Sequence, residues 1–211
     1  GALTIPVTIE GKPVTSIGKS AFSRCYSLTS IRIPDSVTSI GKEAFSGCTD
    51  LTSIIIPDSV TSIGKYAFSS CSDLTSITIP DGLTSIGERA FSSCMKLSAI
   101  EVGAGNISYA DVDGVLLNKR KTILVTYPTG KEGTNYEVPD GVANIGVAAF
   151  YECRNLRSIT IPDSVTSIGE SAFFGCSSLT SIAIPDSVTR IGDYAFVHCT
   201  SLRSIAIPAA V

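Results

Sequence analysis

The chain has 211 residues and carries 16 lysines and arginines against 19 aspartates and glutamates, giving a net charge of −3. This acidic balance argues against a nucleic-acid-binding protein, because phosphate contacts require a basic face. The sequence contains one histidine and no tryptophan, which leaves little material for general acid–base catalysis. No apolar run approaches the ~18 residues that a membrane span needs. We therefore expect neither an enzyme nor direct insertion of this chain into a membrane.

The opening segment, residues 1–18, leads into a unit that repeats with a period of 23 residues. Phenylalanine marks this period seven times, at Phe22, Phe45, Phe68, Phe91, Phe150, Phe173 and Phe196. All seven cysteines follow in the same phase, at Cys25, Cys48, Cys71, Cys94, Cys153, Cys176 and Cys199. In-phase repetition at this period is the signature of a solenoid, in which each unit stacks on its neighbours.

One unit, read from Leu51, shows the physical reason for each column. Ile54 and Ile56 are two residues apart, so an extended segment places both on one face. Pro57 lacks a backbone donor and ends the strand. The chain then returns along the opposite wall, and Gly64 is expected to form a corner with positive φ. The Ala-Phe-x-x-Cys segment is too short for an independent helix, so a single 3₁₀ or α turn is expected.

Stacking such units at ~4.8 Å produces parallel β-structure and turns the phenylalanine column into a buried aromatic spine. The unit L-T-S-I-x-I-P-D-S-V-T-S-I-G-x-x-A-F-x-x-C resembles the BspA-type, or treponemal-type, leucine-rich repeat. That resemblance implies an α/β repeat solenoid, a right-handed coil with a concave parallel sheet, short convex segments and single helical turns. It also implies surface proteins associated with adhesion, without catalytic residues. The resemblance covers nearly all of residues 1–211, which we interpret as a single domain.

One interval departs from the period, because about 36 residues, 103–138, are inserted between Val102 and Val138. Two apolar runs, Val115–Leu117 and Thr122–Tyr127, flank the polar tip Asn118–Lys121, which predicts a hairpin. Asp113-Gly114 is a second turn signal. The pattern predicts a hairpin-bearing insert or variant repeat that does not divide the chain into two domains.

Several residue types resemble chemical sites without the required spacing. No C-x-x-C pair occurs, so the cysteines are interpreted as free, buried thiols rather than zinc ligands. An aspartate follows the strand-ending proline in most units and is interpreted as an exposed turn cap. Asp111-Val112-Asp113-Gly114 begins like a calcium loop, but Val115 and Thr122 stand where further ligands are needed. Asn106-Ile107-Ser108 is a glycosylation sequon, meaningful only in a eukaryotic secretory host. We expect no metal and no cofactor.

Positions that the fold leaves free are the candidates for binding. The least regular column on the outer face of the strands contains Arg32, Ile55, Thr78, Glu101 and Thr160, on a surface otherwise made of small residues. Such a face suits a protein or glycan ligand, and its alternative is a merely soluble sheet face. The basic tip Lys119, Arg120 and Lys121 is a second candidate, with a solvated turn as its alternative.

We interpret the sequence as an extracellular or cell-surface recognition module of the adhesin type, whose partner is a host or microbial surface protein or glycan. The alternatives are a structural spacer without a ligand and a targeting appendage of a secreted enzyme. The chain stops in the middle of a unit at Ile207–Val211, which suggests that the array continues.

Overall fold

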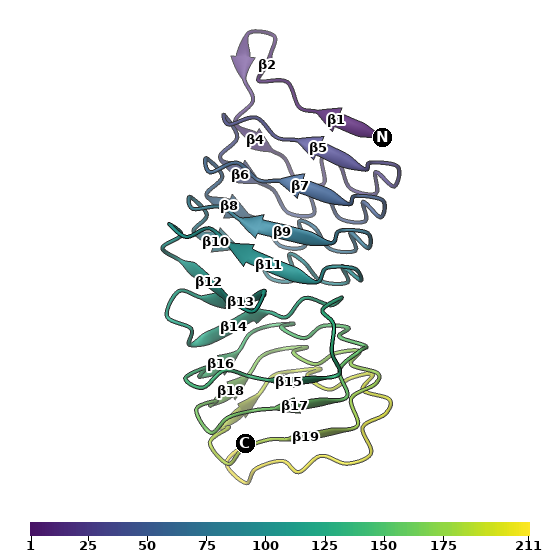
Figure 1. The fold of residues 1–211 in the computed structure, drawn as a ribbon, viewed down its shortest axis with the longest axis vertical. Helices are drawn as coiled ribbons and strands as arrows, with labels where there is room; N and C mark the ends of the chain where they lie inside the picture. The colour runs from purple at the N-terminus through teal and green to yellow at the C-terminus, as the bar shows by residue number, and fades with distance from the viewer.

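The computed structural model describes all residues from 1 to 211 and shows a β-solenoid that contains no helix. Successive coils stack along the long axis of the molecule, from the N-terminus at one end to the C-terminus at the other (Figure 1). The repeat solenoid expected from the 23-residue period is confirmed, because strands 23 residues apart pair in parallel, Ser30 with Ser53 and Ser39 with Ser62.

Two walls of short parallel strands run along the coil. The first wall is formed by the L-x-S-I-x-I segments: β1 (Ala2–Thr4), β5 (Ser30–Arg32), β7 (Ser53–Ile55), β9 (Ser76–Ile79), β11 (Ala99–Val102), β15 (Asn135–Glu137), β17 (Ser158–Thr160) and β19 (Ser181–Ala183). The second wall is formed by the T-S-I-G segments: β4 (Ser16–Ile17), β6 (Ser39–Ile40), β8 (Ser62–Ile63), β10 (Ser85–Ile86), β16 (Asn144–Ile145), β18 (Ser167–Ile168) and β20 (Arg190–Ile191). Because the register is in phase with the repeat, identical columns lie side by side.

The first wall is not one continuous sheet. It consists of three sheets, with the orders β1-β5-β7, β11-β9 and β15-β17-β19. β7 and β9 belong to different sheets but remain neighbours, since the amide of Thr75 donates to the carbonyl of Thr52 at 3.4 Å. The break between β11 and β15, in contrast, coincides with the insert at residues 103–138. A single parallel sheet along the whole array, as the repeat alone suggests, is therefore wrong at this point.

The expectation of single helical turns is also wrong. The segment after Gly41 forms a series of β-turns, in which the amides of Ala44, Ser46 and Cys48 each donate to the carbonyl three residues earlier. The intervening amides of Glu43, Phe45 and Gly47 point to the next coil instead and donate to its carbonyls. Glu43 and Gly47 adopt φ values of 58° and 75°. A helix requires consecutive right-handed residues, so these left-handed positions exclude one.

Glycine is required at position 64, but not because of the corner with positive φ that the sequence predicts. Its φ is not positive; the positive value lies two residues later, at Tyr66, with φ 58°. A Cβ on Gly64 would lie 2.5 Å from the backbone nitrogen of Lys42 and 2.6 Å from the carbonyl carbon of Gly41. Glycine is needed here because adjacent coils approach too closely for a side chain.

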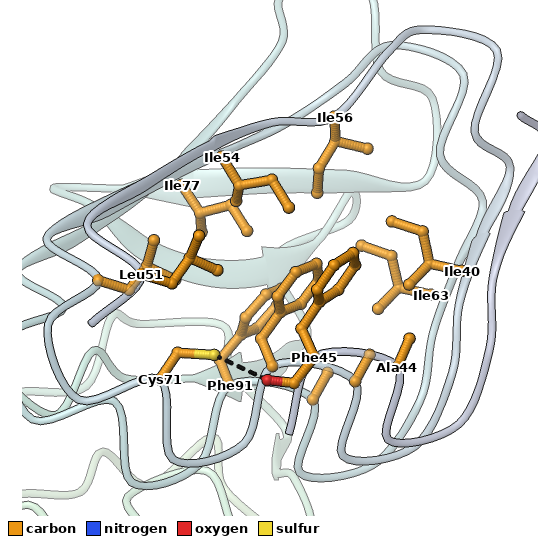
Figure 2. Close-up of a cluster of buried hydrophobic side chains, with 14 of the residues drawn as sticks. Ile40, Ala44, Phe45, Leu51, Ile54, Ile56, Ile63, Cys71, Ile77 and Phe91 are labelled. Atoms are coloured by element: carbon orange, nitrogen blue, oxygen red, sulfur yellow. Dashed lines mark hydrogen bonds between the residues drawn. The ribbon is translucent and has the colours of Figure 1, made fainter. Parts of the chain in front are cut away.

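The core is the predicted aromatic spine. The rings of Phe45 and Phe68 are stacked with centroids 5.3 Å apart, and those of Phe68 and Phe91 are 5.7 Å apart. Isoleucines of both walls enclose the rings, as Figure 2 shows for Ile54 and Ile56 on one side and Ile40 and Ile63 on the other. The stacking therefore buries side chains that a single coil could not cover alone.

The insert contains the predicted hairpin and one further strand. β12 (Tyr109–Val112), β13 (Val115–Asn118) and β14 (Ile123–Thr126) pair antiparallel in that order, and β14 continues into the second wall through β16. Leu116 packs in the N-terminal core cluster, whereas Val115 and Leu117 pack in the C-terminal one. β13 therefore forms the boundary between two cores.

The insert is a variant repeat with an added hairpin. Tyr127 lies 23 residues before Phe150 and takes the place of a repeat phenylalanine. Its amide donates to the carbonyl of Ala149 in the next coil, as the amide of Phe45 does to Ala67, and its ring stacks on Phe150 at 5.2 Å. The amide of Ile100 on β11 donates to Gly114 in the turn between β12 and β13. This turn therefore lies along the edge of β11 that would otherwise face β15.

The opening segment is already part of the array. β1 pairs in parallel with β5, and the short antiparallel hairpin of β2 (Thr8–Ile9) and β3 (Lys12–Pro13) connects it to the second wall. In Figure 1 this hairpin projects from the N-terminal end of the solenoid.

Candidate binding surface

The irregular column is exposed on the outer side of the first wall. Arg32, Ile55, Thr78 and Glu101 lie on the consecutive strands β5, β7, β9 and β11, and all four side chains are exposed. Arg32 pairs directly with Ile55, and Thr78 with Glu101. Since side chains alternate along a strand, the neighbours of each position point toward the core; they are isoleucines except for the half-buried Val102 after Glu101. The structure therefore brings these four predicted residues together on one face.

Ile55 is the exceptional member of this column. Its side chain is 82% exposed, although the neighbouring Ile54 and Ile56 are buried. It borders a shallow hollow of about 420 Å³ that is also lined by Thr78, Asp58 and Asp81. An isolated, exposed isoleucine beside hydroxyl and carboxylate groups provides an apolar contact with polar groups around it.

Thr160 does not join this group. It lies on β17, in the separate sheet that starts after the insert. There it pairs with Glu137, which the sequence analysis did not include among the candidates. The signal for Glu137 was present, because Tyr136-Glu137-Val138-Pro139 matches the I-x-I-P register. Thr4 was missed as well; it pairs with Arg32, and Leu3-Thr4-Ile5-Pro6 carries the same pattern.

The basic tip is smaller than its sequence indicates. Lys119, Arg120 and Lys121 are all exposed in the connection between β13 and β14. However, the ammonium group of Lys119 donates to the backbone carbonyl of Asn106. Arg120 and Lys121 remain without an ion pair, so two rather than three cations are free to meet a ligand.

Asn106 holds this tip in place. It occupies the slot of Leu83 one repeat earlier and is fully buried. Its amide group donates to the carbonyls of Pro80 and Leu83 at 2.7 and 3.0 Å, and its oxygen accepts from the amides of Ser108 and Tyr109, both at 2.8 Å. Every polar atom of the side chain is satisfied. The sequon therefore has no accessible asparagine in the folded protein.

The cysteine column consists mainly of buried thiols of low reactivity. All seven thiols are free, and only Cys25 is exposed. The thiols of Cys48, Cys71, Cys94, Cys176 and Cys199 each donate to the carbonyl of the phenylalanine 26 residues earlier, and Figure 2 shows the bond from Cys71 to Phe45. Burial raises the pKa of Cys48 to about 11 and that of Cys94 to about 12. These thiols are thus poor nucleophiles at neutral pH.

No group of three histidine, cysteine, aspartate or glutamate residues is placed to hold a metal ion. Two of the aspartates that follow the prolines accept from backbone amides of the next coil: Asp58 from Asp81 at 3.3 Å and Asp81 from Gly105 at 3.0 Å.

The repeat unit matches a known family. The BspA type leucine-rich repeat region matches residues 4–111 and 129–211 in six copies. The chain belongs to this family. Leucine-rich repeat domains are in general protein-interaction modules, and no catalytic family is indicated. No curated protein matches the chain significantly.

Solved structures of other leucine-rich repeat proteins superpose well on this BspA-type array. A leucine-rich repeat protein from Eubacterium ventriosum has 31% identity and a TM-score of 0.82, over 97% of this chain and 65% of its own. The pneumococcal vaccine antigen PcpA has 26% identity and a TM-score of 0.86, over 96% of this chain and 56% of its own. A leucine-rich cell surface protein from Faecalibacterium prausnitzii has 31% identity and a TM-score of 0.66, over 100% of this chain and 82% of its own.

The chain thus spans less than two thirds of the first two of these proteins. Within the 211 residues, no helix has the length and apolar character to cross a membrane.

Proposed function

We propose that this BspA-type array is a cell-surface recognition module of the adhesin type, which binds a surface protein or glycan of a host or another microbe. The binding face in this proposal is the outer side of β5, β7, β9 and β11, with Ile55 at its centre and Arg32 and Glu101 at its margins. Thr160 belongs to a second face, beyond the insert. The similarity to a cell surface protein and to a vaccine antigen supports the proposed location at the cell surface.

The observation that carries the proposal is the 82% exposure of Ile55 on a flat face of small polar residues. Covering an isoleucine fully contributes about 1.5–3 kcal/mol, and binding energy at interfaces concentrates in such few residues. The flanking charges of Arg32 and Glu101 would orient a partner and make its association sensitive to salt.

The basic tip is the competing site on this chain. Arg120 and Lys121 would favour acidic glycans, with an affinity that falls steeply as salt screens the charges. A spacer without a ligand and a targeting appendage of a secreted enzyme are the remaining alternatives. A spacer predicts no binding at all, and an appendage predicts a hydrolase domain in the full-length gene.

The test uses immobilised extracellular-matrix proteins and a glycan array as probes, at two ionic strengths. For the probe that binds, we expect Ile55→Ser to weaken affinity about tenfold or more. The matched control is Ile107→Ser, because Ile107 is 77% exposed but lies in the insert rather than on the first wall.

The triple variant Lys119→Ser/Arg120→Ser/Lys121→Ser separates the two candidate sites. If this variant abolishes binding while Ile55→Ser leaves it intact, the face centred on Ile55 is not the binding site. Equal losses in Ile55→Ser and Ile107→Ser would show a general effect of removing exposed apolar surface. Absence of binding to every probe would favour the spacer.

A further inference from the structure

A second polar hollow lies on the C-terminal half of the array, away from Ile55. It has a volume of about 390 Å³ and no apolar residue lines it. Its walls come from three consecutive coils, at the loops that precede β15, β17 and β19: Glu132, Thr134, Arg154, Asn155, Arg157 and Ser178.

Arg157 occupies a slot that holds threonine or serine in most coils and arginine again only at Arg203. In the same slot of other coils, a hydroxyl donates to the carbonyl of the preceding coil, as Thr52 does to Thr29 at 3.2 Å and Thr180 to Arg157 at 3.1 Å. The side chain of Arg157 does not make this hydrogen bond to the preceding coil. Its guanidinium makes no ion pair, and no side-chain hydrogen bond of Arg157 replaces the lost one. Of the two arginines in this slot, Arg157 lines the hollow and Arg203 does not, so Arg157 supplies a guanidinium without an anionic partner to it.

Arg154 lies in the same coil, at a variable position where other coils have Tyr26, Thr49, Ser72, Met95, Ser177 or Thr200. Its guanidinium is held by the carboxylate of Glu152 at 3.0 Å. That carboxylate in turn accepts from the hydroxyl of Ser93 at 2.7 Å. Arg154 is therefore held against a fixed partner, whereas Arg157 has no anion of its own.

We infer that this hollow binds an acidic sugar residue, a hexuronic acid or a similar carboxylated unit of a glycan. The planar fork of Arg157 matches a carboxylate in a bidentate manner. Thr134, Asn155 and Ser178 provide both donors and acceptors for sugar hydroxyls, and the unpaired carboxylate of Glu132 accepts from them. The volume suits one sugar ring rather than an extended peptide.

The same chemistry explains why an acidic peptide fits less well. A peptide ligand that adds affinity through side chains uses apolar or aromatic pockets, and this hollow has neither. Glu132 would also repel a second carboxylate, whereas a sugar offers it hydroxyl groups. This site is independent of the face centred on Ile55.

The experiment compares two probes that differ only at the sugar C6: methyl glucuronide, which has a carboxylate, and methyl glucoside, which has a hydroxymethyl group. Amide chemical shifts of the folded protein are followed by NMR during titration. We expect the glucuronide to shift resonances of residues 132–134 and 154–157 and the glucoside to bind about tenfold more weakly or not at all.

Four variants make the result specific. Arg157→Gln should weaken glucuronide binding about tenfold, and Arg157→Lys should recover only part of it, since an ammonium keeps the charge without the fork. The matched control Arg190→Gln removes an exposed arginine from the second wall of the same half and should leave binding unchanged. Ile55→Ser should also leave it unchanged, so failure of this site and failure of the Ile55 face are distinguishable.

Equal binding of both sugars, or binding of neither, would overturn the inference. So would an acidic peptide that shifts the same resonances while the glucuronide does not. Unaltered glucuronide binding by Arg157→Gln would show that another residue holds the carboxylate.

Discussion

Truncation of Phe68 tests whether the aromatic spine is the main source of stability. Phe68 is fully buried, and its ring stacks on Phe45 at 5.3 Å and on Phe91 at 5.7 Å. Phe68→Ala removes about six carbon atoms from the core, which at ~0.8 kcal/mol per buried carbon costs about 4–5 kcal/mol. Neighbouring coils are tied by backbone hydrogen bonds and cannot collapse far into the space, so we expect a loss of ~3–5 kcal/mol.

Such a loss is a large share of the ~5–15 kcal/mol that stabilises a typical domain. For a chain of this length it corresponds to a decrease in Tm of about 6–20 °C. Urea unfolding followed by far-ultraviolet circular dichroism measures the free energy directly. Phe22→Ala is the control, because Phe22 is half-buried and stacks only on Phe45, and it should cost no more than half as much.

A loss below ~1 kcal/mol for Phe68→Ala would refute the spine as the core, because full burial of a phenylalanine contributes more than that. Equal losses for Phe68→Ala and Phe22→Ala would show that burial between two rings adds nothing beyond burial against one.

Two further predictions concern buried groups. In the folded protein only Cys25 should react with a thiol reagent, even near pH 10, because burial raises the pKa of Cys48 to about 11 and that of Cys94 to about 12. In denaturant without reductant, all seven thiols should react. Two or more cysteines already oxidised would contradict the interpretation of the column as free thiols. Asn106→Val restores the apolar residue of the repeat but leaves two carbonyls of the preceding coil and two amides of the insert without their partner, so we expect a loss of ~2–4 kcal/mol. A neutral or stabilising effect in urea unfolding would show that these bonds do not hold the insert.

The sequence alone predicts much of this architecture because each column repeats a physical requirement. The spacing of Ile54 and Ile56, the stacking of Phe68 and the hairpin around Asn118 depend on local periodicity, which needs no knowledge of distant contacts. The face containing Arg32 and Ile55 follows from strand alternation in the same way.

Other features depend on the approach of neighbouring coils, which periodicity does not describe. Gly64 is required by the backbone of Gly41 and Lys42, not by its own φ. The turn at Gly114 interrupts the first wall because it hydrogen-bonds to Ile100 on β11. Thr160 is separated from Ile55 for that reason. The spacing of residues in the sequence does not show whether an insert will lie between two strands of a sheet.

Departures from the repeat fall into two physical classes, and the structure distinguishes them. Asn106 and Tyr127 replace an apolar residue and a phenylalanine, yet each replacement is compensated: Asn106 by four hydrogen bonds to the surrounding backbone, and Tyr127 by its stacking on Phe150. Ile55 and Arg157 are not compensated, because one exposes apolar surface to water and the other abandons a hydrogen bond between coils. Ile55 and Arg157 are therefore the positions at which a bound partner would supply a contact that the folded chain does not. Binding experiments should therefore concentrate on Ile55 and Arg157.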